Sequence, residues 1–536
     1  MNAHAGTSVL GLFVRRYWPI LALLVVLLLT SAVRIRLLNV PLERDEGEYA
    51  YTAQLLLAGH APFDGAYSLK LPGTAMMYAG SFLAFGQSVA AIRFGLLLVN
   101  VATVLLLVGI GKKIGGSTVA FATGATFAFA SLSVSVFGFS ANTEHYAILF
   151  VVAGTYLLLA YRERPTWFRA LLVGLALGIA LLMKQHAALF ALWAFLWLWW
   201  YARKQLTVRQ TFFNVSSFAV ATLAPLALLV LYVWARGTLP AMTFWTWTYA
   251  RAYAAIAPVG GAAQNFIIAG AGILITLGGI LALAALGLGN VFRPPRGNER
   301  WFVATWIIAS SIALSIGFYF RGHYFILILP ALCVCAGLGV RAIAQFLNRH
   351  HGKRVALVGA AAVLGLVLLW VAAREVSYWF RYSANEFSMR AYPFEDFTTY
   401  REIANDVAKL VRPGDRMAVV GSEPELLFYS HTVSVTGYLY MYPFLEQQPY
   451  RERMFEEFTR EVEGGRPDIL VVVADHFSWG GQPWEVDHPV WQWLTGYQKS
   501  YDIVLQRELP VQWKISSARQ QALPKREWLA VYRRRL

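Results

Sequence analysis

The chain has 536 residues, of which 57% are hydrophobic and only 14% are charged, whereas soluble domains usually carry about 25% charged residues. A water-soluble protein of this size could not bury so much apolar surface, so the composition predicts a polytopic membrane protein and excludes disordered, fibrous and disulfide-stabilised classes. We attribute the net charge of +16 to membrane topology and anionic lipids rather than to nucleic-acid binding, and Cys333 and Cys335 lie in an apolar run that suits neither a structural disulfide nor a thiolate zinc site.

Apolar runs of membrane-spanning length recur from the N-terminus to residue 373. A transmembrane helix needs about 20 apolar residues, and the sequence predicts about eleven such spans. The expected spans cover residues 17–38, 92–111, 117–137, 144–161, 167–183, 186–201, 212–235, 265–289, 301–320, 323–346 and 354–373. We assign 71–86 to the membrane interface, because nearly all cationic loops then lie on one side. The positive-inside rule identifies that side, with the N-terminus, as the cytoplasm.

The first outer loop, residues 39–91, carries acids close to the membrane surface. Asp45, Glu46 and Glu48 follow the first span, and the next ten residues are predicted to form an interfacial helix. If this helix starts early, Asp45 and Glu48 share a face and Glu46 points elsewhere. Solvated acids at a helix N-terminus are the simpler interpretation. Lys70 in the same loop favours a functional one, because acids and cations at one membrane surface suit a reaction of a lipid-linked anion.

Four further ionisable residues lie at the expected outer ends of spans. Glu144 begins the fourth span, Lys184 separates two short spans, and Arg321 and His323 lie between the ninth and tenth. An interfacial cap, a snorkelling lysine and a cationic loop would explain them without function. Acids and bases at the edge of a membrane often face cavities, so we keep all four as candidates for substrate or phosphate binding.

The tail, residues 374–536, has the charge, alternation and turn signals of a soluble fold. Residues 400–411 are predicted to be helical, and the strands are expected at 416–421, 467–473, 501–509 and 528–534. An odd number of spans places this tail outside, so we predict a transmembrane domain over 1–373 and an extracytoplasmic α/β domain over 374–536. Glu423, Asp475 and His476 lie near predicted strand ends, and we assign this domain to acceptor recognition or a lid.

Several short motifs together resemble membrane glycosyltransferases of the GT-C superfamily. The motifs are Asp45-Glu46 after the first span, Lys70-x-Pro72-Gly73, Thr143-Glu144-His145, and Arg321-x-His323-Tyr324 leading into Leu329-Pro330. They are most similar to those of protein O-mannosyltransferases, lipid A aminoarabinose transferases and lipopolysaccharide galacturonosyltransferases. The resemblance covers roughly the first 340 residues. It implies a GT-C type fold, a polyprenyl-phosphate-linked sugar donor, and transfer to an acceptor on the outer face.

The resemblance also implies roles for individual residues. Asp45 matches the candidate general base, and Glu46 would orient the sugar or the acceptor. Lys70 matches the phosphate-binding lysine that precedes the proline, and Tyr49 matches a motif tyrosine that contacts phosphate or sugar. His323 has a counterpart in the family motif, and we place Arg321 beside it as a second phosphate ligand.

One position departs from the aminoarabinose transferases, which carry arginine where this chain has Glu48. An anion there makes aminoarabinose a less favoured sugar and suggests that Glu48 binds a sugar hydroxyl. The remaining substrate-binding candidates are Glu144, Lys184 and Tyr324.

A sugar on a polyprenyl phosphate already has a good leaving group, so the reaction needs one general base and a cationic cradle rather than two catalytic carboxylates. We expect no obligatory cofactor; a divalent metal is possible in this superfamily, but no ligand spacing indicates one. Expected partners are membrane lipids, the lipid-linked sugar and a glycan, lipid or protein acceptor, with no nucleic acid. A bacterial inner membrane with a periplasmic active site fits best. The alternatives are a secondary transporter or flippase, a non-catalytic scaffold, and a polymerase or ligase that uses a lipid-diphosphate oligosaccharide.

Overall fold

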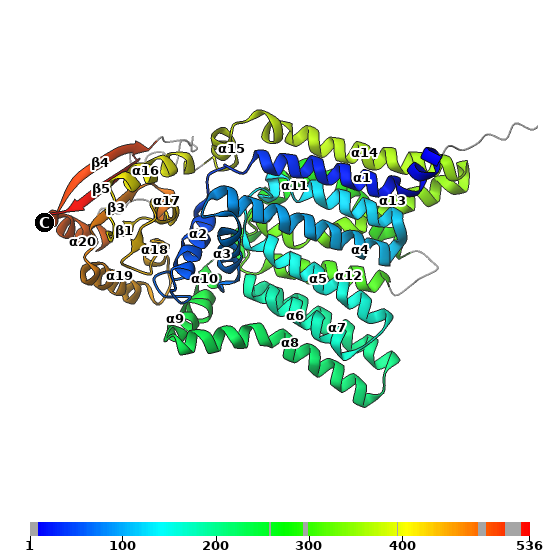
Figure 1. Ribbon diagram of the computed structural model, residues 1–536, viewed down its shortest axis with the longest axis horizontal. Helices are drawn as coiled ribbons and strands as arrows, with labels where there is room; N and C mark the ends of the chain where they lie inside the picture. The colour runs from blue at the N-terminus through cyan, green and yellow to red at the C-terminus, as the bar shows by residue number, and fades with distance from the viewer. Residues whose placement is uncertain are drawn as a thin grey trace, which may run out of the picture.

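The computed structural model describes residues 9–256, 259–292, 299–393, 395–480, 489–509 and 527–535. Long apolar helices lie side by side in a bundle, and a smaller mixed α/β region is attached to one end of it (Figure 1). The bundle helices are α1 (Val9–Arg36), α4 (Val89–Ala130), α5 (Thr143–Glu163), α6 (Trp167–Met183), α7 (Ala188–Gln205), α8 (Val208–Ala235), α11 (Val259–Val291), α12 (Glu299–Ser315), α13 (Leu329–His351) and α14 (Lys353–Val376).

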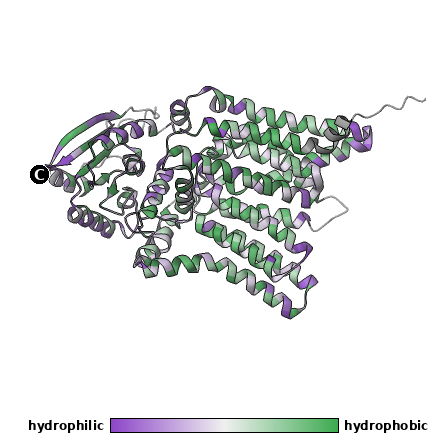
Figure 2. Cartoon of the chain, in the orientation of Figure 1, coloured by the Kyte–Doolittle hydropathy of each residue, from purple (hydrophilic) through white to green (hydrophobic). Residues whose placement is uncertain are grey.

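Six helices in the described part of the chain, namely α4, α5, α8, α11, α13 and α14, are long and apolar enough to cross a membrane. The helices α6 and α12 have 17 residues each, which corresponds to about 26 Å and is the short end of the range for a span. Hydrophobic residues run along the bundle and hydrophilic residues gather at its ends (Figure 2). The protein is therefore an integral membrane protein, as its composition predicts.

Each expected span falls on a helix of the bundle, but the predicted ends of three spans differ from the ends of the helices. The span expected at 117–137 ends at Ala130, where the chain turns into a short 3-10 helix, and α12 ends at Ser315 rather than near 320. The span expected from 323 begins at Leu329, because Pro330 occupies the first turn of α13, where proline is favoured.

The long helix α4 is a hairpin of two antiparallel segments rather than one rod. Gly116 has a φ of +79°, a left-handed conformation that glycine adopts without strain. A Cβ built on Gly111 would lie 2.9 Å from Cα of Ala120, and one on Gly124 would lie 2.5 Å from a methyl group of Val108. Residues so far apart in sequence touch only if the chain reverses, which confirms the two spans expected at 92–111 and 117–137.

Short elements connect the bundle helices at the end that faces the α/β region. They are α2 (Arg44–Leu57), α3 (Gly73–Phe85), η1 (Val134–Val136), η2 (Gln185–Ala187), α9 (Leu239–Thr243), η3 (Phe244–Tyr249), α10 (Ala250–Ile256) and η4 (Gly322–Leu327). With 13 residues, α3 spans only about 20 Å, which is too short to cross the bilayer. Leu83 on this helix is 77% exposed, as expected for the interfacial segment predicted at 71–86.

The described residues between 377 and 535, here called the C-terminal region, form a five-stranded mixed sheet with flanking helices. Its elements are η5 (Ser377–Arg381), α15 (Ala384–Ala391), α16 (Phe397–Leu410), β1 (Arg416–Val420), α17 (Glu425–Ser430), β2 (Val433–Ser434), α18 (Tyr442–Leu445), α19 (Arg451–Gly465), β3 (Ile469–Ala474), η6 (Phe477–Trp479), α20 (Pro489–Tyr497), η7 (Gln498–Ser500), β4 (Tyr501–Leu509) and β5 (Glu527–Arg534).

The sheet order is β2-β1-β3-β5-β4. β1 pairs in parallel with β2 and β3, in register Met417 with Ile469, whereas β5 is antiparallel to β3 and β4. All four strands expected from the sequence are present. The two-residue β2 was not predicted, because it is too short to show alternation. The central β3 is fully buried, which agrees with its continuous apolar run.

The C-terminal region packs directly against α2 and α3. One hydrophobic cluster contains Tyr51 of α2, Phe82 of α3, Phe428 of α17 and Val471 of β3. The rings of Phe82 and Phe428 stack with centroids 5.7 Å apart. The short elements of the first outer loop are therefore enclosed between the membrane bundle and the sheet.

Candidate functional site

The helix α2 begins earlier than the expected interfacial helix, because Glu43 caps it. The Glu43 carboxylate accepts hydrogen bonds from the backbone N–H groups of Asp45 (3.0 Å) and Glu46 (3.3 Å). In turn, the Glu46 carboxylate accepts a hydrogen bond from the backbone N–H of Glu43, and the two contacts together form a capping box. Asp45 and Glu48 consequently lie one turn apart on adjoining positions of the helix surface, and Glu46 points away from them.

Lys70 joins the acids of α2 into one cluster. Its Nζ lies 3.1 Å from Oδ1 of Asp45 and 3.5 Å from Oε2 of Glu48, and 4.6 Å from the centre of the Tyr49 ring. The side chains of Lys70 and Asp45 are 27% and 21% exposed, so a ligand can reach both. This group of Asp45, Glu48, Tyr49 and Lys70 is called the α2 cluster below.

The position of Lys70 depends on a close contact between α3 and α6. The N-cap of α3 is Pro72, and a Cβ on Gly73 would lie 2.5 Å from the carbonyl oxygen of Leu182, so only glycine fits there. The side chain of Gln185 donates a 2.8 Å hydrogen bond to the carbonyl of Leu69. The Lys-x-Pro-Gly motif thus fixes the loop that presents Lys70.

Glu48 is 4% exposed and has three polar partners. It accepts hydrogen bonds from the hydroxyl of Ser68 and, at 2.9 Å, from the hydroxyl of Tyr440, and it contacts Lys70. A narrow pocket beside it is lined by Thr52, Phe63 and Ala66, together with the members Glu48, Tyr49 and Lys70 of the α2 cluster. This carboxylate keeps acceptor capacity next to an accessible lysine.

A second cluster forms where α5, α6 and η4 meet. Glu144 at the start of α5 is fully buried and forms an ion pair with Lys184, and Nε2 of His323 lies 3.9 Å from the same carboxylate oxygen. Nζ of Lys184 lies 4.1 Å above the ring of Tyr324, which suits a cation–π contact. The four residues Glu144, Lys184, His323 and Tyr324, here called the α5 cluster, are therefore in mutual contact.

Electrostatics link the two clusters through Asp45. Burial opposes ionisation of this carboxyl, but Lys70, Arg321 and His323 outweigh burial and lower the pKa of Asp45. Burial works against the charge of Lys70 as well, yet Asp45 and Glu48 raise the pKa of its ammonium above the ordinary value. Burial lowers the pKa of His323 to about 4, so this imidazole is neutral at physiological pH. Residues from two distant parts of the chain, the first loop and the segment around 321–323, thus act on one carboxylate.

Glu46 is not part of either cluster. It has no exposed surface, and its carboxylate forms a bidentate ion pair with Arg93 of α4, one arm of which measures 2.7 Å. The backbone N–H of Ala141 donates a further hydrogen bond of 2.6 Å to it. With these partners, the Glu46 carboxylate holds α2 to the bundle and points away from the α2 cluster.

The acidic residues expected to form a site in the tail are also engaged. Glu423 forms an ion pair with Arg44 at 3.1 Å and accepts a 2.9 Å hydrogen bond from Ser478, and Asp475 accepts a hydrogen bond from the hydroxyl of Tyr400. Burial raises the pKa of Glu423 to about 7, against the opposing effect of Arg44. Glu423 thus connects the C-terminal region to the first turn of α2, whereas Asp475 is bound within the C-terminal region.

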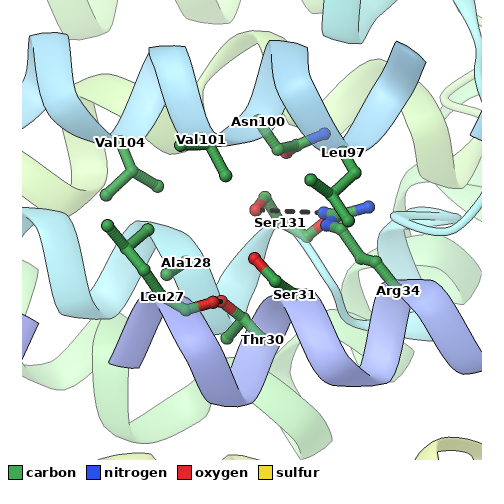
Figure 3. Close-up of a pocket in the computed structure, with 10 residues that line it drawn as sticks. All are labelled: Leu27, Thr30, Ser31, Arg34, Leu97, Asn100, Val101, Val104, Ala128 and Ser131. Carbon is green, nitrogen blue, oxygen red and sulfur yellow. Dashed lines mark hydrogen bonds between the residues drawn. The ribbon is translucent and has the colours of Figure 1, made fainter. Parts of the chain in front are cut away.

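Arg34 and Arg36, at the end of the first span, form hydrogen bonds with neighbouring segments of the chain. Arg34 is buried and donates hydrogen bonds to the carbonyls of Gly138 (2.9 Å) and Ser131 (2.8 Å). It lines a small pocket between α1 and α4, whose other lining residues are both polar, such as Asn100, and apolar, such as Val104 (Figure 3). Arg36 donates to the carbonyls of Trp379 and Tyr382. Their donors are used by the protein, so neither forms part of the α2 cluster.

Sequence reasoning missed three residues that shape the site. Arg93 has a local signal, since it is a charge at the edge of an apolar run. Ser68 and Tyr440 have no local signal. Nothing in the sequence distinguishes this serine from other serines, and Tyr440 lies 392 positions from the Glu48 that it contacts. Within the described residues, no group of three or more histidine, cysteine, aspartate or glutamate side chains is arranged to hold a metal ion.

Comparisons with known proteins agree on the fold. A family model described as dolichyl-phosphate-mannose-protein mannosyltransferase matches residues 70–234. The structure is similar to that of ArnT from Cupriavidus metallidurans bound to undecaprenyl phosphate, with 16% identity, 98% of each chain covered and a TM-score of 0.58. It is similar to the archaeal oligosaccharyltransferase AglB from Archaeoglobus fulgidus, in complex with an inhibitory peptide and a dolichol-phosphate, with 13% identity, 96% of this chain and 76% of that chain covered, and a TM-score of 0.53.

A third similar structure is the arabinofuranosyltransferase AftD from Mycobacteria, with 13% identity, 97% of this chain and 40% of that chain covered, and a TM-score of 0.50. A search of curated proteins gives no match. The chain therefore has the fold of the GT-C glycosyltransferases, as its motifs indicate.

Proposed function

We propose that this protein is a glycosyltransferase that moves a hexose or pentose from a polyprenyl-phosphate-linked donor to an acceptor hydroxyl on the outer face of the membrane. The observation that carries the proposal is the contact of 3.1 Å between Asp45 and Lys70, both partly exposed, at the end of the bundle that faces the C-terminal region. A proton acceptor and a phosphate-binding cation meet there. Arg321 and His323 lie close enough to act on the same carboxylate.

The chemistry of the donor explains why this pair suffices. As the bond to the sugar breaks, the polyprenyl phosphodiester becomes a monoester and gains negative charge. Lys70 and Arg321 bind that charge better in the transition state than in the ground state, which lowers the barrier. Asp45 removes the proton of the acceptor hydroxyl while the hydroxyl oxygen attacks the anomeric carbon of the sugar. His323, neutral near pH 7, donates a hydrogen bond to the phosphate.

Lys70 also explains how Asp45 becomes a useful base. Without donor, Lys70 forms ion pairs with Asp45 and Glu48, which hold the pKa of Asp45 low and make it a weak base. A bound phosphate competes for the ammonium and adds a negative charge nearby. Both effects raise the pKa of Asp45, so the base strengthens when the donor is in place.

The remaining candidates fit substrate binding. Glu48, held by Ser68 and Tyr440, accepts a hydrogen bond from a sugar hydroxyl, and Tyr49 packs against the sugar or phosphate. In the neighbouring cluster Lys184 and Tyr324 contact the acceptor or the donor, and the fully buried Glu144 holds Lys184 in place. Glu46 contributes indirectly, by fixing the helix that carries Asp45.

The similar proteins support the donor class and leave the acceptor open. The ArnT structure holds undecaprenyl phosphate, the AglB structure holds a dolichol-phosphate and a peptide, and AftD is an arabinofuranosyltransferase by name. The ArnT and AglB structures share a lipid carrier of the polyprenyl-phosphate type. We place the site and the C-terminal region in the periplasm of a bacterial inner membrane, where a lipid, glycan or protein serves as acceptor.

The test measures transfer and donor binding separately. Purified protein is incubated with a cell-envelope extract and undecaprenyl phosphate linked to radiolabelled mannose, galacturonate or aminoarabinose, and release of undecaprenyl phosphate is followed. We expect Asp45→Asn to lose turnover by at least a hundredfold, on the order of the contribution of a general base, while binding undecaprenyl phosphate at least as tightly as the wild type, because a competing negative charge at Lys70 is gone. Lys70→Ala should weaken that binding and slow turnover together.

Lys409→Ala serves as the control, because Lys409 is an exposed lysine outside both clusters that pairs with Asp406 on its own helix. Normal turnover by Asp45→Asn would remove the base assignment. Unchanged binding by Lys70→Ala would remove the phosphate assignment, and donor binding by the wild type without any release of undecaprenyl phosphate would favour a flippase.

A further inference from the structure

Three consecutive residues of α2 contact three different parts of the molecule. Each residue advances about 100° around a helix, so neighbours point in different directions. Arg44 contacts the C-terminal region, Asp45 contacts Lys70, and Glu46 contacts Arg93 of α4. The base candidate therefore lies between two buried ionic contacts on opposite sides of its own helix.

Arg44 binds the C-terminal region at three separate points. It is 6% exposed, and its guanidinium donates to Glu395 at 2.6 Å, to Glu423 at 3.1 Å and to the carbonyl of Phe477 at 3.1 Å. The carbonyl of Arg44 accepts a hydrogen bond of 3.3 Å from Tyr440. A planar guanidinium with several charged partners has one allowed orientation, so it fixes the first turn of α2.

The same face of α2 continues this contact along the helix. A Cβ on Gly47 would lie 2.6 Å from the backbone nitrogen of Glu425, so the two backbones touch there. The hydroxyl of Tyr51 accepts a hydrogen bond of 2.8 Å from the N–H of Ser434, and Gln54 donates one of 3.2 Å to the carbonyl of Phe428. Positions 44, 47, 51 and 54 follow helical spacing, and all of them contact the C-terminal region.

Contacts with the bundle oppose this face. The ion pair of Glu46 with Arg93 is fully buried, and Ala50 and Ala53, one and two turns further along the helix, are also buried. If the C-terminal contacts were lost, α2 would be held from one side only. The helix could then rotate, and Asp45 would move relative to Lys70 and to a bound donor.

We propose that Arg44 is a positioning residue, through which the docked C-terminal region holds α2 in the rotation that directs Asp45 at Lys70. This inference rests on the proposed function, because it assigns Arg44 a role in presenting the base. The C-terminal region is then part of the machinery of transfer, and the site is complete only when that region is docked.

The test uses the full chain with Arg44→Met, which keeps side-chain length and removes the charge. In the donor assay, kcat should fall about tenfold or more, the effect expected of a misplaced catalytic group, while KM and the binding of undecaprenyl phosphate stay within about twofold. Arg44→Lys should recover part of kcat, since one ammonium can replace part of the guanidinium's contacts. Arg533→Met is the control, because Arg533 forms its ion pair with Asp415 within the C-terminal region.

Docking itself is measured without activity. Gln54 and His431 lie side by side across the boundary, with 3.1 Å between their side-chain nitrogens. Cysteines at these two positions, with Cys333 and Cys335 replaced by alanine, are joined with a short bis-maleimide. Arg44→Met should slow this crosslinking several-fold, and Arg533→Met should not.

The results separate the two proposals. Normal kcat in Arg44→Met overturns the positioning role, and so does an equal loss of kcat and phosphate binding, which would indicate general misfolding. If no donor is turned over by the wild type but crosslinking still depends on Arg44, the proposed function fails and the docking contact stands. If crosslinking is unchanged while kcat falls, Arg44 does not act through the C-terminal region, and the inference is rejected.

Discussion

Asp45 is the residue on which the charges of the site converge. Its carboxylate is partly buried, which alone would favour the neutral form, but Lys70, Arg321 and His323 lower its pKa. The protein thus keeps an ionised acid beside two permanent cations, Lys70 and Arg321. In the proposed mechanism these same two cations bind the phosphate of the donor, so donor binding and the base strength of Asp45 would be coupled.

The coupling predicts a shift in the pH profile of Arg321→Gln. The acid limb of kcat/KM reports the pKa of the base in the free enzyme, and in the wild type this limb should lie below the ordinary range of an aspartate. Removing Arg321 withdraws one of the charges that lower this pKa, so the limb should move to higher pH. Arg321 is also a proposed phosphate ligand, so its loss would change the rate as well, and the pH of the limb is compared rather than the maximal rate.

Arg236→Gln provides the control for this profile. Arg236 is an exposed cation on the same side of the bundle, and it donates to the carbonyl of Gly59 at 2.9 Å. Its loss should leave the acid limb in place. An unmoved limb in Arg321→Gln would show that Arg321 does not act on the base.

At the scale of elements, α2 lies between the membrane bundle and the C-terminal region and contacts both. Its capping box starts it at Arg44, its bundle face carries Glu46, and its remaining faces carry the α2 cluster and the contact with α17. A short helix of 14 residues has little stability alone. Packing on two sides is therefore what keeps it helical and in register.

Substitution of Gly47 tests this packing. A methyl group there would meet the backbone of Glu425 at 2.6 Å, and a backbone cannot move aside cheaply. We expect Gly47→Ala to destabilise the protein by about 1–3 kcal/mol, measured as a lower Tm in detergent. Gly80→Ala on α3, where a Cβ meets nothing within 4 Å, should leave Tm unchanged or raise it slightly. Equal effects of both substitutions would mean that α2 and α17 do not pack as described.

At the scale of the whole molecule, charge is divided between the two ends of the bundle. The end away from the C-terminal region carries the ion pairs of Lys113 with Glu163 (2.8 Å) and of Arg162 with Glu299 (3.5 Å). The other end carries the α2 and α5 clusters. Under the proposed function a lipid donor in the membrane reaches the second end, and the positive-inside rule predicts that the cationic first end lies in the cytoplasm.

Labelling in intact cells tests this orientation. A cysteine in place of Ser383, which is exposed at the start of α15, should react with a membrane-impermeant maleimide. A cysteine in place of Lys113 should react only after the cells are permeabilised. The native Cys333 and Cys335 are buried and should give little background. The reverse pattern would invert the topology and place the site in the cytoplasm.

The sequence by itself determined the membrane bundle, the α/β character of the tail and the residue types of the site. Apolar runs, strand alternation and the Pro72-Gly73 motif are local signals, which can be recognised in the sequence without knowledge of the tertiary structure. For the same reason the nearness of Asp45 and Glu48 was predictable once a helix was assumed, since helical spacing alone decides it.

Only the tertiary structure decided which acids are open and which are enclosed. Asp45 and Glu46 are neighbours with the same chemistry, yet one meets a partly exposed lysine and the other is sealed against Arg93, 47 positions away. The contacts of Arg44 with Glu395 and Glu423 join residues more than 350 positions apart. Burial and long-range pairing arise from packing the whole chain, and no spacing in the sequence encodes them.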